Sequence, residues 1–222
     1  MIITETSLGD LAATGPDARG VLLRHQLDFC CGGGQSLADA CKAGDLDLQQ
    51  VVTDLEAAAT RGSESVDWRE RPVEDLVNHI LERFHRPLPE HVNSVVAAAE
   101  KVERVHAAKA SCPHGLAAHL RAIRDDLTSH LAKEEQVLFP ALLGGQRGGM
   151  LNGPVTVMMR EHDDHGENLK HTRSLTKDFV PPEEACATWR ALYEELTRLE
   201  ADLMEHIHLE NHVLFPRALK KV

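Results

Sequence analysis

This chain of 222 residues has few aromatic side chains and no excess of positive charge. Aromatic residues make up only 4% of it, which suits helices rich in alanine and leucine better than an all-β sandwich. A net charge of -11 argues against nucleic acid or an anionic membrane surface as the main partner. No apolar run approaches the roughly 20 residues of a membrane span, and the N-terminus lacks the basic and then apolar layout of a signal peptide. These absences predict a soluble, cytoplasmic protein with no nucleic-acid or membrane partner.

Cysteine is also scarce. The five cysteines are too few and too scattered for a disulfide framework, but Cys30 and Cys31 are adjacent. A disulfide between neighbours closes a strained ring that distorts the peptide between them, and such a disulfide is easily reduced. Gly32–Gly34 then let the backbone approach another surface, and Ser36 begins a helix whose N-terminus favours a nearby thiolate. We therefore predict a redox or iron-transfer site at Cys30 and Cys31, the alternative being two small buried apolar residues in a loop.

Histidine, by contrast, is abundant: the chain has 14, and several fall in a repeated pattern. The segment His130–Pro140 recurs as His206–Pro216, with His, Glu, Val, Leu, Phe and Pro at matching places. In each copy a His and a Glu are four residues apart, so a helix places them on one face, about 6 Å apart at Cβ. One such pair usually belongs to a solvated surface, whereas two matched pairs suit two adjacent metal ions. The pairs are His130 with Glu134 and His206 with Glu210.

The repeat extends more weakly to two lone histidines, because Arg83–His85 resembles Arg160–His162. Counted from the helix ends at about 1.5 Å per residue, the four histidines fall within ~8 Å of one level. Imidazole binds iron, zinc and copper, and two carboxylates able to bridge hold a pair of ions close together, with open positions for a small ligand such as O2 or NO. His165, His208 and His212 flank these motifs and are expected to support the site rather than bind metal. The predicted ligands are His85, His130, Glu134, His162, His206 and Glu210.

The chain divides into two helical parts. Residues 1–62 predict a small domain of short helices, with N-caps at Ser7, Ser36 and Asp47. Residues 63–71 are polar and predict a linker. Residues 72–222 predict an up-down four-helix bundle, because short connections join long helical stretches. Pro87 and Pro89 should kink or interrupt the first stretch, Pro140 and Pro216 should lie near helix ends, and residues 137–139 and 213–215 should pack in the core. The four stretches are 72–109, 114–143, 154–178 and 183–219.

The ligand pattern resembles that of hemerythrin-like domains, and Asp28–Leu37 is similar to the signature of the iron-sulfur cluster repair (repair of iron centres) di-iron proteins. The resemblance covers about residues 5 to 219. It implies a hemerythrin-like bundle with two non-haem iron ions, oxo- and carboxylate-bridged, in a bacterial cytoplasmic protein that is often a dimer. It also implies repair of iron-sulfur clusters damaged by nitrosative or oxidative stress. His106 fits the family pattern too, but we exclude it from the ligand set because it lies about 31 Å beyond His85 on a continuous helix.

Three functions remain open. The first is repair, with damaged iron-sulfur proteins as partners, by iron donation or by reduction of NO, which would be an oxidoreductase activity. The second is a module that binds or senses O2 or NO without turnover. Iron storage ranks last, since a single bundle has no evident cavity. The adjacent cysteines favour the first, because a pure oxygen carrier has no need of them. The arrangement is compatible with a homodimer, and spacing alone does not pair the histidines with individual ions.

Overall fold

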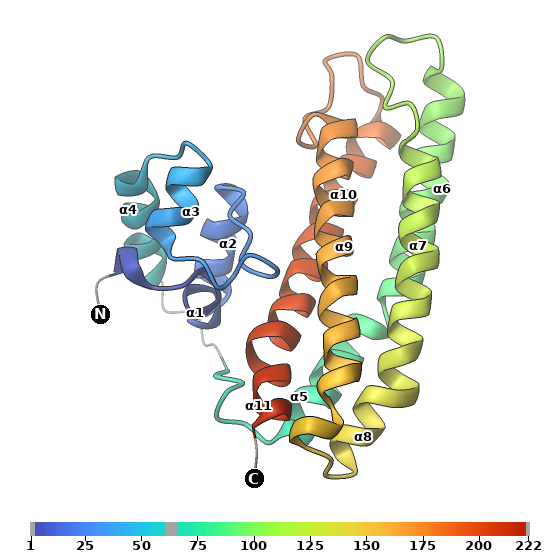
Figure 1. Ribbon diagram of the computed structural model, residues 1–222. Helices are drawn as coiled ribbons and strands as arrows, with labels where there is room; N and C mark the ends of the chain where they lie inside the picture. Colours follow the sequence, from blue (N-terminus) through green and yellow to red (C-terminus); the bar gives the residue numbers. More distant parts are fainter. Residues whose placement is uncertain (1–2, 61–65, 221–222) are drawn as a thin grey trace.

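The computed structural model describes residues 3–60 and 66–220, and all regular elements in these ranges are helices. A group of short helices lies beside an elongated bundle of long ones (Figure 1). The predicted all-α class and four-helix bundle are therefore confirmed. Residues 63–65 of the predicted linker lie outside the described residues, and the domain boundaries remain predictions. Within the described ranges, no helix is both long enough and apolar enough to cross a lipid bilayer.

The N-terminal helices begin where the sequence places their caps. Ser7 accepts a hydrogen bond from the Asp10 amide, and Ser36 accepts one from the Asp39 amide. Asp47 accepts from two amides of the helix that follows it. These bonds satisfy amides that a helix leaves free in its first turn. The elements are η1 (Ile3–Glu5), α1 (Leu8–Ala13), α2 (Pro16–Arg24), α3 (Leu37–Ala43) and α4 (Leu48–Ala59).

The bundle contains four long helical stretches close to the predicted ones. α6 packs against α7 and α10, and α9 packs against α7 and α10. The first stretch comprises α5 (Val73–Ile80), η2 (Leu81–His85) and α6 (Leu88–His106). The second comprises α7 (Leu116–Lys133), η3 (Glu134–Leu138) and α8 (Phe139–Leu143). After η4 (Gly148–Met150), the third is α9 (Asn152–Thr176), and the fourth comprises α10 (Ala187–Leu209), η5 (Glu210–Leu214) and α11 (Phe215–Leu219).

Three of these stretches contain a π-turn, in η2, η3 and η5. In these turns an amide bonds to the carbonyl five residues earlier, as Phe139 does to Glu134. A proline follows two residues after each turn, at Pro87, Pro140 and Pro216. Proline lacks an amide hydrogen and its ring clashes with the carbonyl four residues before it, so a widened turn relieves the clash. The interruption predicted at Pro87 takes this form.

The apolar core falls into two clusters, and the histidines and glutamates of the repeat lie between them along each helix. One cluster contains residues of the N-terminal helices together with residues of α6, α7, α9 and α10, and the other surrounds α5, α8 and α11. Residues 213–215 are buried in the second cluster as predicted, but Val137 is 56% exposed, so its predicted core position is wrong. Val213, the matching residue of the second copy, is only 3% exposed, so this position of the repeat is buried only in the second copy.

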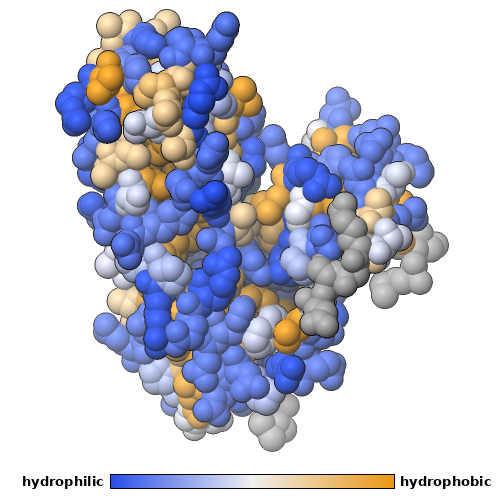
Figure 2. Space-filling model, turned by 180° about the vertical axis from the view of Figure 1, so that it is seen from behind, coloured by the Kyte–Doolittle hydropathy of each residue, from blue (hydrophilic) through white to orange (hydrophobic). Residues whose placement is uncertain are grey.

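The loop between α2 and α3 carries the adjacent cysteines and reaches the bundle (Figure 1). A Cβ atom at Gly33 would lie 2.3 Å from His212 Nε2, and one at Gly166 would lie 3.2 Å from Cys31 Sγ. Glycine at position 33 thus permits the close approach that the sequence predicts. The reverse side of the molecule, where the two parts also meet, is largely hydrophilic (Figure 2).

Candidate metal centre

The six predicted ligands meet in one buried layer of the bundle. Their side chains come from all four helical stretches, and none of these residues is more than 3% exposed. They form two sets, and within each set donor atoms lie within 4.8 Å of one another. Both glutamates belong to both sets. One set is His85, Glu134, His206 and Glu210, and the other is His130, Glu134, His162 and Glu210.

The histidines face one another in pairs. His85 Nε2 lies 3.1 Å from His206 Nε2, and His130 Nε2 lies 3.1 Å from His162 Nε2. Each pair joins the lone histidine of one half of the repeat to the histidine of the His–Glu motif in the other half. The geometry therefore supplies a pairing that the sequence spacing left open.

The two glutamates lie between these pairs. Glu134 Oε2 is 3.4 Å from both His85 Nε2 and His130 Nε2. The two oxygens of Glu210 are divided, since Oε2 is 3.2 Å from His162 Nε2 and Oε1 is 3.2 Å from His206 Nε2. Each glutamate therefore reaches both pairs, as a bridging carboxylate must.

The layer fits a pair of cations better than it fits an empty core. The carboxylate oxygens of Glu134 and Glu210 are fully buried and make no hydrogen bond. A buried polar group without a partner costs free energy, and a buried charge costs more. Imidazole nitrogens and carboxylate oxygens that converge without partners are explained by metal ions held among them.

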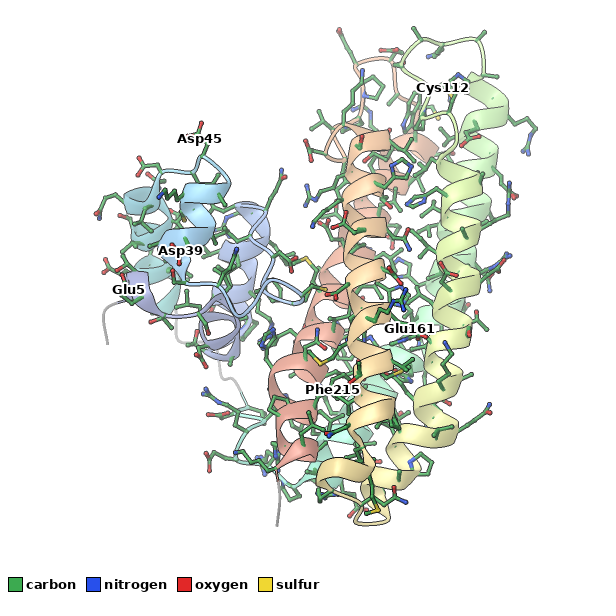
Figure 3. All side chains as sticks on the ribbon, viewed as in Figure 1. Glu5, Asp39, Asp45, Cys112, Glu161 and Phe215 are labelled. Carbon is green, nitrogen blue, oxygen red and sulfur yellow. The ribbon has the colours of Figure 1, made fainter. Side chains whose placement is uncertain are left out.

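Outer hydrogen bonds orient three of the four imidazoles. His85 Nδ1 lies 3.0 Å from Glu135, His130 Nδ1 lies 2.9 Å from Glu161, and His162 Nδ1 lies 2.8 Å from Asn211 Oδ1. An acceptor at Nδ1 places the ring proton there and leaves the Nε2 lone pair directed at the layer. Figure 3 labels Glu161 and also Phe215, whose ring stacks on His162 at a centroid distance of 5.7 Å.

These outer partners were missed in the sequence. A usable signal exists, because each is the immediate sequence neighbour of a predicted ligand. Glu135 follows Glu134, Glu161 precedes His162, and Asn211 follows Glu210. In a helix, adjacent residues diverge by about 100°, so a neighbour of one ligand reaches around to a different one.

Burial dominates the electrostatics of the layer. It raises the pKa of Glu134, and the neighbouring carboxylate of Glu210 raises it further. Burial also raises the pKa of Glu210, but His206 and His162 outweigh it and hold this pKa below its usual range. Burial lowers the pKa of His130 to about 3. A cation favours ionised carboxylates and neutral imidazoles, so His130 is already in the form that binds metal.

The flanking histidines belong to neither set. His165 packs edge-on against His130 at 4.9 Å between ring centroids, and His208 is buried against Phe29. His106 lies at the end of α6, where its Nε2 is 3.2 Å from Cys186 Sγ and its ring lies against Trp189.

His208 gives the iron-free protein a measurable pH dependence. Burial lowers its pKa from 6.5 to about 3. At a pH between these values, His208 is therefore protonated in the unfolded chain but neutral in the folded chain. The free energy of unfolding must therefore fall as the pH falls through this window. Between pH 7 and pH 5, the free energy of unfolding of His208→Leu should fall by about 2 kcal/mol less than that of the wild-type chain. Denaturant unfolding of both iron-free proteins at the two pH values measures this, and equal losses would contradict it.

The cysteine loop contacts the backbone of one residue of the metal layer. Cys31 Sγ lies 3.2 Å from the carbonyl oxygen of His162 and 3.6 Å from Cys30 Sγ. The Asp28 carboxylate accepts hydrogen bonds from the amides of both cysteines. The hydrogen bond with Cys31, and then burial, raise the pKa of Cys30 well above its usual value. The expected thiolate is therefore wrong for Cys30, since its neighbours and burial outweigh the nearby helix N-terminus.

Comparisons with known proteins agree with this geometry. Residues 76–218 match the hemerythrin HHE cation binding domain, and residues 4–59 match a domain of unknown function, DUF542. The chain is 46% identical over 220 residues to the iron-sulfur cluster repair protein YtfE of Pectobacterium carotovorum, and the match covers 99% of each chain. It is 48% identical over 214 residues to that of Yersinia pseudotuberculosis, covering 96% of each. The cofactor is a di-iron centre, which the buried histidines and glutamates fit. The chain belongs to the hemerythrin HHE family and, along nearly its whole length, to the family of the YtfE iron-sulfur cluster repair proteins.

Proposed function

We propose that this chain repairs iron-sulfur clusters damaged by nitrosative or oxidative stress. The observation that carries the proposal is the contact between two features that an oxygen carrier has no reason to combine. These are the cysteine loop and the metal layer, which meet where Cys31 Sγ lies against the His162 carbonyl. The names of the relatives, iron-sulfur cluster repair proteins, support the same function. Damaged iron-sulfur proteins are then its partners and the cytoplasm its compartment.

In this proposal each residue of the layer has a defined part. His85 and His206 would hold one iron ion, and His130 and His162 would hold the other. Glu134 and Glu210 would each supply a carboxylate to both ions. The ions would supply redox chemistry and would bind a small ligand such as NO or O2. The protein contributes a dry layer between two apolar clusters, which excludes water and strengthens every charge interaction within it.

Cys30 and Cys31 have the proposed role of receiving iron or passing electrons at the edge of the layer. Together with Asp28 they form a third group whose donor atoms lie within 4.8 Å of one another. Cysteine sulfur and carboxylate oxygen are iron ligands, so this group would offer an ion leaving the layer its next set of donors. A homodimer is compatible with this role, since the loop acts within one chain.

Reactivation of an NO-damaged iron-sulfur enzyme tests the function. We expect the iron-loaded chain to restore the enzyme, and we expect Cys30→Ser/Cys31→Ser to retain both irons but restore it about tenfold more slowly. Cys41→Ser, which alters a buried cysteine of α3 away from the layer, is the matched control and should restore at the normal rate.

The outcomes separate the candidate functions. Absence of reactivation together with a stable, reversible NO adduct would replace repair by sensing. Rapid consumption of NO with formation of N2O would identify reduction, rather than iron donation, as the route. Full activity of the double serine variant would remove the cysteines from the proposal and leave the rest standing.

A further inference from the structure

One side chain links the cysteine loop to an iron ligand. Asn211 Nδ2 donates to the Cys30 carbonyl at 3.2 Å, and Asn211 Oδ1 lies 2.8 Å from His162 Nδ1. The same carbonyl accepts a second bond, at 2.9 Å, from His212 Nε2. The peptide oxygen between the two cysteines is thus held by two consecutive residues of η5.

The chemistry of the groups fixes the orientation of this link. A carbonyl only accepts hydrogen bonds, so the amide NH2 of Asn211 must face Cys30 and its oxygen must face His162. The proton of His162 then lies on Nδ1, and its Nε2 is free to bind metal. The orientation of the imidazole therefore depends on where the Cys30 carbonyl is.

The link is confined to one of the four histidines. His85 and His130 have carboxylate partners, Glu135 and Glu161, that belong to the bundle itself. Within the described chain, only the outer partner of His162 is also bonded to the N-terminal part. A change in the position of the loop should therefore affect His162, and the ion position that it shares with His130, before the other pair.

We propose that Asn211 is a positioning residue that couples the oxidation state of Cys30 and Cys31 to the grip of His162 on its iron. A disulfide between adjacent cysteines distorts the peptide that joins them, and that peptide carries the carbonyl held by Asn211. Oxidation displaces this acceptor, frees the amide of Asn211 and loosens His162. Reduction restores the link. The inference rests on the proposed function.

The redox step balances with a low-molecular-weight disulfide as the oxidant. Cys31, the more exposed of the two, attacks the reagent, and one reagent thiol leaves. Cys30, whose Sγ lies 3.6 Å away, then displaces the second thiol. Two protein S–H bonds and the reagent S–S bond are lost, one protein S–S bond forms, and the reagent leaves as two thiols that carry the two electrons and the two protons.

The test measures iron release from the full-length, iron-loaded chain to a chelator, with the cysteines reduced or oxidised by such a disulfide. We expect release to be about tenfold faster from the oxidised wild-type chain, the scale of lost outer-partner contacts in metal sites. In Asn211→Ala release should be fast in both states. In Asn211→Asp it should be slow in both states, because the carboxylate still accepts from His162 but no longer bonds to Cys30.

Two controls isolate the coupling. Cys30→Ser/Cys31→Ser should not respond to the reagent, and Asn93→Ala, an exposed asparagine of α6, should behave as wild type. The inference is overturned if no Cys30–Cys31 disulfide forms, if the oxidised wild-type chain releases iron no faster, or if Asn211→Ala keeps the full difference between states. A wild-type chain that binds no iron would instead overturn the proposed function, and this inference with it.

Discussion

Replacing Glu134 or Glu210 with alanine is expected to reduce the iron content from two ions per chain to almost none. Each glutamate belongs to both donor sets, and each approaches a histidine of both pairs. Loss of either carboxylate removes an anionic ligand from both ions at once. The remaining donors are mostly neutral imidazoles, which do not offset the charge of two cations confined together in a buried layer. Metal analysis of protein purified without added metal measures the change.

Glu135→Ala is the matched control for this experiment. Glu135 follows Glu134 directly, but its carboxylate contacts His85 Nδ1 from outside and its side chain is 48% exposed. We expect this variant to keep both irons, with an affinity reduced by about tenfold for the ion held through His85. Retention of one full iron in Glu134→Ala or Glu210→Ala would show that the carboxylates do not bridge.

The second large effect distinguishes histidines that share an ion from histidines that do not. Removing His85 and His206 together should leave one iron, because both nitrogens face the same point 3.1 Å apart. Removing His85 and His130 should leave none, because each substitution empties a different position. Both double variants delete two imidazoles from the same layer, so a general loss of packing affects them alike. The iron content then reports the pairing.

His106→Ala should retain two irons, since His106 contacts Cys186 and Trp189 at the far end of α6. Equal iron contents in the His85/His206 and His85/His130 double variants would refute the pairing. One iron missing from His106→Ala would return that residue to the ligand set.

Much of the fold and of the site could be predicted from the sequence. The repeat of His130–Pro140 at His206–Pro216 is specific because its spacing, its types of residue and its terminal prolines all recur. Helical periodicity places the His and the Glu of each motif on one face of their helix. The rise per residue places the four histidines at a similar height along the bundle. The caps at Ser7, Ser36 and Asp47 follow from local chemistry alone. These inferences need no tertiary information.

The rest depends on how the helices are rotated about their axes, which the sequence does not specify. Level alone cannot pair His85 with His206 rather than with His130. Asn211 was missed because its importance comes from a loop more than 150 residues away in the sequence, whose carbonyl it meets only after the two parts of the chain have docked. The exposure of Val137 has the same origin, since the repeat is exact in sequence at that position but only its second copy is covered.

The π-turns of η2, η3 and η5 contain three of the six ligands, His85, Glu134 and Glu210. Each turn holds one residue more than an unbroken α-helix would need. Deletion of a single residue there restores α-helical winding and leaves the segments on either side nearly in phase, because the π-turn had absorbed the extra residue. The proline ring would then clash with the carbonyl four residues before it, the clash that the widened turn now relieves. The extra residue in each turn is thus what allows a proline to follow so closely after these ligands.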